Sequence, residues 1–86
     1  MQTLKGLRTS YGFTQEELAN MFGVTSRTIQ NMEKDSTNIR DSLLKKYMVA
    51  FDVSYDDIFL GKEYEIFEFY NKRKKIVLKR LQAEPV

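Results

Sequence analysis

The chain has 86 residues, with 14 Lys and Arg against 12 Asp and Glu, and it contains neither cysteine nor histidine. This length allows one small domain, and the missing residue types exclude disulfides, zinc fingers and catalysis by a thiolate or an imidazole. The net charge of +2 is too small to identify a polyanionic partner, so the local arrangement of side chains has to indicate one.

The first predicted element is a helix over residues 2–11. At 100° per residue, one stripe of this helix contains Leu4, Leu7, Arg8 and Tyr11. An arginine on an otherwise apolar stripe needs a partner, because an unpaired buried charge is costly. Gly12 is expected to end the helix in the left-handed conformation.

The second and third predicted helices follow each other closely. Thr14 and Glu17 form a T-x-x-E capping box, which predicts the start of the second helix. Gly23 ends that helix, and Thr25 can cap a third helix over residues 26–34. So short a link makes the two helices cross steeply, which is a helix-turn-helix.

The third helix has an apolar and a polar face. One arc of about 140° collects its long polar side chains, namely Ser26, Arg27, Gln30, Asn31 and Lys34. A helix with such a face fits the DNA major groove, where arginine pairs with guanine and asparagine with adenine. A solvated polar face is the alternative for the helix taken alone, but its capped neighbour favours DNA recognition.

Two more helices complete the predicted domain. A stripe of helical period predicts the fourth helix, and it consists of Leu43, Leu44, Tyr47, Met48 and Phe51. Ser54 and Asp57 predict the capped start of a short fifth helix, which Gly61 ends. Residues 1–61 are therefore expected to form an all-α domain of five helices.

Residues 62–86 form a C-terminal extension. Its first part, EYEIFEFY, is rich in aromatic and β-branched residues and predicts an extended segment, and the basic run after Asn71 predicts a short helix. A hairpin fits the same pattern, and the residues around Pro85 are expected to fray. The apolar side chains predict a homodimer contact, with packing on the domain as the alternative: they are Tyr64, Ile66, Phe67, Phe69 and Tyr70.

Two motifs carry a resemblance to a known family. T-Q-E-E-L-A-x-x-x-G-V-T-x-x-T-I-x-x-M-E at residues 14–33 and AFDVSYDDIFLG at residues 50–61 resemble the Cro/repressor-type helix-turn-helix family of phage and bacterial transcriptional regulators. The resemblance spans about residues 3–61. It implies a five-helix fold that binds double-stranded DNA, usually as a homodimer.

The resemblance also implies roles for individual residues. Ser26, Arg27 and Asn31 match positions that reach base edges, and Gln15 matches a glutamine that contacts phosphate and braces the reader helix. Arg8 is expected to form a structural ion pair with Glu33. Further backbone or supporting contacts are expected from Thr14, Asn20, Thr28, Gln30, Lys34, Asn38 and Arg40.

The functional expectation is a sequence-specific transcriptional regulator, most simply a cytoplasmic phage-type repressor on a pseudo-palindromic operator. Neither a cofactor, a metal, a membrane nor a small-molecule ligand is expected. Two alternatives stay open: a DNA-binding antitoxin whose extension neutralises a toxin, and a protein-interaction module that has lost DNA binding. An enzyme is the weakest interpretation, because the acidic pairs at residues 16–17 and 56–57 occupy first turns of helices, where negative charge is favourable.

Overall fold

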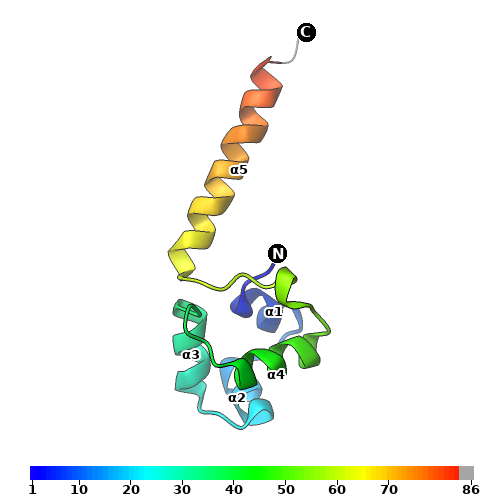
Figure 1. The fold of residues 1–86 in the computed structure, drawn as a ribbon, viewed down its shortest axis with the longest axis vertical. Helices are drawn as coiled ribbons and strands as arrows, with labels where there is room; N and C mark the ends of the chain where they lie inside the picture. The colour runs from blue at the N-terminus through cyan, green and yellow to red at the C-terminus, as the bar shows by residue number, and fades with distance from the viewer. Residues whose placement is uncertain (84–86) are drawn as a thin grey trace.

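The computed structural model describes residues 1–83 of the protein (Figure 1). Its elements are α1 (Leu4–Ser10), α2 (Gln15–Phe22), α3 (Ser26–Lys34), α4 (Asp41–Phe51), the 3-10 turn η1 (Tyr55–Asp57) and α5 (Glu63–Ala83). The predicted all-α class is confirmed over this range. Figure 1 shows α1 to η1 gathered into one rounded body, from which α5 projects. The fraying predicted around Pro85 lies outside the described residues.

The first three helices begin at threonine caps. The side chains of Thr3, Thr14 and Thr25 each accept a hydrogen bond from a backbone N–H in the first turn, which satisfies one of the donors that a helix start leaves free. Gly12 and Gly23 follow α1 and α2 at φ values of +79° and +69°. The left-handed conformation predicted at Gly12 is therefore confirmed.

The hydrophobic core lies between α1, α2, α3 and α4. Tyr47 of α4 is fully buried at its centre, with its ring 5.0 Å from that of Phe22 and 6.1 Å from that of Phe51. The other buried members are Leu4, Leu7, Leu18, Ala19, Ile29, Leu43, Leu44 and Ile58. The apolar stripes predicted for the helices meet in this core, but Tyr11 of the first stripe lies outside it and is 62% exposed.

Backbone contacts between distant segments close the body. Gln2 donates its N–H to the carbonyl of Asp57 and accepts from the N–H of Phe59, both at 2.8 Å. Ser36, which is buried, donates its N–H to the carbonyl of Gly61 at 2.9 Å, and its hydroxyl oxygen accepts from the N–H of Gly61 at 2.9 Å. These two hydrogen bonds join the segment that follows α3 to the segment that precedes α5.

The predicted fifth helix is a single 3-10 turn. Ser54 and Asp57 form the expected capping box, but the chain cannot continue as a helix because Ile58 is extended, with φ −107° and ψ 128°. That extended conformation lets the segment pair with Gln2.

The prediction of an extended segment or hairpin over residues 63–70 is wrong, because α5 is one helix of 21 residues. No strand lies beside this segment within residues 1–83, so only a helix satisfies its backbone hydrogen bonds internally. Glu63 and Glu65 in the first turn also favour a helix start. Asn71, which precedes the predicted short helix, lies inside α5.

Ile66 is the only buried residue of α5, with 4% of its surface exposed. It therefore packs within its own protomer and is not available for the predicted subunit contact. The other four residues of that prediction, Tyr64, Phe67, Phe69 and Tyr70, are exposed. Nothing within residues 1–83 combines the length and apolarity that a helix needs to cross a bilayer.

Tyr47→Phe is expected to raise the free energy of unfolding by about 1 kcal/mol. The hydroxyl of Tyr47 is buried and makes no hydrogen bond within residues 1–83, so removing it relieves an unsatisfied polar group. Urea unfolding measures the change, and Tyr55→Phe, at an exposed tyrosine, should have no effect. A loss of stability in Tyr47→Phe would show that the hydroxyl is hydrogen-bonded in solution.

Candidate nucleic-acid interface

The turn between α2 and α3 is fixed at both ends. At its start, the N–H of Val24 donates to the carbonyl of Ala19 at 3.0 Å. At its end, the hydroxyl of Thr25 accepts from the N–H of Thr28 at 3.2 Å. The turn is short and contains a left-handed glycine, so α3 crosses α2 steeply in a helix-turn-helix.

Five polar side chains of α3 face solvent. Ile29 is fully buried and Met32 is half-buried, so these two anchor the helix to the body. The exposed set comprises Ser26, Arg27, Gln30, Asn31 and Lys34. The helix therefore presents an uninterrupted surface of hydrogen-bond donors and positive charge on a rigid apolar base.

A buried network holds α3 in place. Arg8 donates from Nε to Glu33 Oε2 at 2.6 Å and from Nη2 to Glu33 Oε1 at 3.0 Å. Its Nη1 donates to the carbonyl of Phe13 at 2.8 Å, and Gln15 Nε2 donates to Glu33 Oε1 at 3.0 Å. One carboxylate thus joins α1, α2 and α3.

The pair in this network is well shielded from water. The side chains of Arg8 and Glu33 are 10% and 4% exposed. The hydrogen bonds to Glu33 raise the pKa of the Arg8 guanidinium, against the opposing effect of its burial. The Arg8 guanidinium therefore stays charged at neutral pH, and neither side chain points toward solvent as a DNA contact would.

The remaining residues predicted to contact DNA lie on the two sides of α3. Thr14 and Asn20 are exposed on the α2 side, where the hydroxyl of Thr14 is engaged in the capping box. On the other side, one concavity between α3 and the start of α4 brings together Thr28, Asn38 and Arg40. The hydroxyl of Thr28 also lies 3.0 Å from that of Thr25.

Lys46 belongs to this concavity and was missed in the sequence analysis. Its Nζ donates to the carbonyl of Phe22, the last residue of α2. A positive charge there favours the helix end and fixes it to α4. The only signal in the sequence is that Lys46 lies one turn after the core residue Leu43, which does not reveal the contact with α2.

Comparison with known proteins agrees with this geometry. A helix-turn-helix family model matches residues 4–58, which end before α5. A protein of Archaeoglobus fulgidus described as an uncharacterized HTH-type transcriptional regulator is 37% identical over 65 residues, covering 76% of this chain and 92% of the relative. A second protein of that organism with the same description is 34% identical over 64 residues, covering 74% and 91%.

Arg8→Met and Glu33→Gln are each expected to lower the free energy of unfolding by about 3–5 kcal/mol, because either change leaves a buried charge without its partner. The double variant should lose clearly less than the sum of the two single losses. Chemical unfolding of the four proteins measures this coupling, with Glu16→Gln as a surface control. Losses that simply add would mean that the two residues are not energetically coupled.

Proposed function

Because the chain belongs to the Cro/repressor-type helix-turn-helix family of DNA-binding transcription regulators, we propose that it is a sequence-specific repressor of the phage type. It occupies a pseudo-palindromic operator as a homodimer in the cytoplasm and blocks a promoter. The observation that supports this most strongly is the exposed polar face of α3 on a helix braced by Arg8, Glu33 and Gln15. The family is generally non-enzymatic, and the proposal includes no catalytic step.

The base contacts in this proposal come from the N-terminal half of α3. That end of the second helix enters the major groove in the helix-turn-helix motif. Arg27 has the planar fork that pairs with guanine, and Asn31 has the amide that pairs with adenine. Ser26, at the first position of α3, reaches a base edge as donor or acceptor.

The phosphate contacts in this proposal flank the reader helix. Gln15, Thr14 and Asn20 lie on the α2 side, facing one strand of the groove. A second group faces the other strand: Thr28, Asn38, Arg40 and Lys46. Gln30 and Lys34 on α3 itself complete the contacts. Phosphate contacts fix the position and register of a protein on DNA, while base contacts select the sequence.

The homodimer follows from the size of the reader surface. One helix of 9 residues covers only a few base pairs, so useful specificity needs two copies. Two copies related by a twofold axis recognise half-sites that are separated by whole turns of DNA.

Arg27→Ala and Lys34→Ala are expected to affect DNA binding differently. Loss of Arg27 should cost about 1–3 kcal/mol on the cognate site and relax the preference at one base position. Loss of Lys34 should weaken cognate and random DNA alike and reduce the salt slope by about one unit, because a lysine beside the backbone acts as a point charge.

Selection of bound sites from random DNA at two salt concentrations provides the cognate site, and titration against its single-base variants separates the two roles. The proposed function predicts an enriched pseudo-palindrome. A library without any enriched sequence would contradict it. If Arg27→Ala weakens every duplex equally, Arg27 contacts phosphate, and base recognition falls to Ser26 and Asn31.

A further inference from the structure

The exposed part of α5 carries a seam of coiled-coil spacing. Phe67, Tyr70, Lys74, Val77 and Leu81 follow one another at intervals of three, four, three and four residues. At 100° per residue they fall within an arc of about 80°, and this alternation corresponds to the a and d positions of a heptad. The four apolar members are exposed by 61%, 41%, 53% and 63% in chain order.

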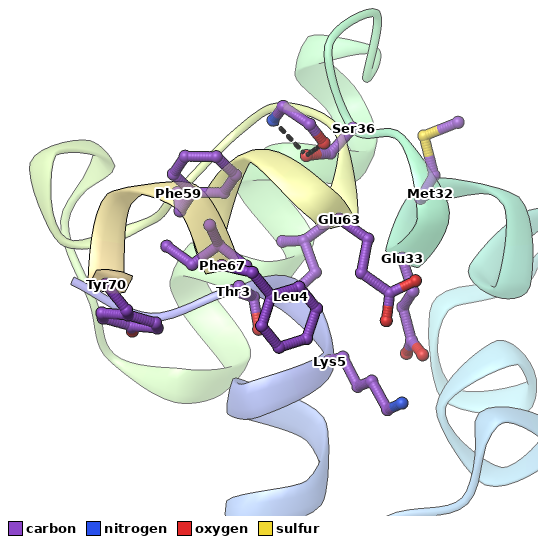
Figure 2. Close-up of a pocket in the computed structure, with 12 residues that line it drawn as sticks. Thr3, Leu4, Lys5, Met32, Glu33, Ser36, Phe59, Glu63, Phe67 and Tyr70 are labelled. Atoms are coloured by element: carbon purple, nitrogen blue, oxygen red, sulfur yellow. Dashed lines mark hydrogen bonds between the residues drawn. The ribbon is translucent and has the colours of Figure 1, made fainter. Parts of the chain in front are cut away.

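The seam faces the same side of α5 as the body. Phe67 and Tyr70 line a cavity of about 240 Å³ between α5 and the body, together with Leu4 of α1 and Phe59 (Figure 2). The same two rings also line the groove that continues along the free part of α5 to Val77. One apolar surface therefore runs from the body along the projecting helix.

We propose that a second copy of this chain covers this surface, with the two α5 helices antiparallel. A parallel pair would bring the two seams together with both bodies at the same end. Because each seam faces the side of its own body, the partner's body would then have to occupy the space of the first. An antiparallel partner instead brings its last turn to that place, over the cavity.

The charges along α5 favour the same arrangement. Its first two turns contain the three acidic residues Glu63, Glu65 and Glu68. The later turns contain only basic charges, which are Lys72, Arg73, Lys74, Lys75, Lys79 and Arg80. A parallel pair places like charges side by side, whereas an antiparallel pair places the acidic start of each helix beside the basic end of the other.

Pairing a positions with d positions gives the antiparallel register. Phe67 then meets the partner's Val77, Lys74 meets the partner's Tyr70, and Leu81 approaches the partner's Glu63. The seam side of the last turns of each α5 then reaches the cavity beside the other body, where Val77 would cover Phe67.

Lys74 acts as the specificity element of this seam. A single lysine at an a position fixes register and partner orientation at a cost in stability. In a parallel pair two copies of Lys74 would face each other inside the seam. In the antiparallel register each ammonium lies against a tyrosine ring and reaches solvent along its flexible stem.

The arrangement also sets the spacing of the two reader helices, an extension that rests on the proposed function. The protomer is 56 Å long, and α5 takes up about 31 Å of that length. With the bodies at opposite ends of the helix pair, their centres lie roughly 50–55 Å apart. That separation exceeds the 34 Å of one DNA turn, so half-sites that are one turn apart do not fit this arrangement.

Val77→Asp and Ile76→Asp form a matched test of the seam. The two residues are neighbours in α5 with similar exposure, 53% and 51%, but Ile76 points about 140° away from the centre of the seam. Sedimentation equilibrium of the full chain should show a dimer, with its dissociation constant raised at least tenfold by Val77→Asp and little changed by Ile76→Asp. Equal effects of the two changes on the dissociation constant would contradict the proposal that the seam forms the dimer contact.

Lys74→Leu tests the seam in the opposite direction. Replacing the lysine with an apolar residue should tighten self-association about tenfold or more, while Lys75→Leu, on the outer side of α5, should leave it unchanged. A tighter dimer cannot arise from damage to the fold. No tightening, or a wild-type chain that stays monomeric, would overturn the proposal and leave the surface to a partner of another kind.

Engineered cysteines test the orientation, because the natural chain has none. A mixture of Glu63→Cys and Leu81→Cys chains should form the mixed disulfide dimer, since the two positions meet in the antiparallel register. Leu81→Cys alone should not cross-link, because its two copies lie at opposite ends of the pair. A disulfide between two copies of Leu81→Cys would show a parallel pair and overturn the orientation.

These experiments test the proposed dimer and the proposed DNA-binding function independently. If no DNA sequence is enriched but the cysteine and aspartate variants behave as expected, the proposed function fails and the dimer stands. If a palindrome is bound by a dimer that Val77→Asp leaves intact, the dimer proposed here fails and the function stands. Half-sites spaced by one turn would likewise contradict the antiparallel arrangement.

Discussion

The orientation of α3 depends on the buried carboxylate of Glu33. It accepts hydrogen bonds from Arg8 on α1 and Gln15 on α2, and Arg8 also binds the carbonyl of Phe13 in the turn between those helices. A buried ion pair adds little net stability once the desolvation of both charges is counted. Its effect here is geometric: three helices share one set of directional bonds, so the outer face of α3 has one direction relative to the body.

Local rules predict most of the body. Threonine caps and left-handed glycines have fixed positions relative to the helices that they delimit, and the apolar stripes show which sides are buried. These rules do not predict the secondary structure at the start of α5, because EYEIFEFY combines strand-like composition with helical spacing. The choice depends on the absence of a neighbouring strand within residues 1–83 and on the burial of Ile66, and neither is encoded in that segment.

Some residues of the candidate interface could likewise be predicted from local rules, and others could not. Residues on the outer face of α3 could be identified from helical periodicity, because one helix determines their common side. Lys46 and Ser36 could not, because their roles arise where α4 approaches the end of α2 and where α3 approaches Gly61. Periodicity describes the sides of single helices, and it does not describe the contacts between segments more than twenty residues apart.

The hydrogen bonds between Ser36 and Gly61 restrict bending at the junction between α3 and α5. Three hydrogen bonds join Ser36, the second residue after α3, to Gly61, the second residue before α5. A side chain at Gly61 would come within 3.1 Å of the Phe59 ring. The junction therefore has little freedom to bend. Coupling between two sites is reciprocal: if an event that reorients α5 changes the binding of a ligand to α3, that ligand changes the free energy of the same event by an equal amount.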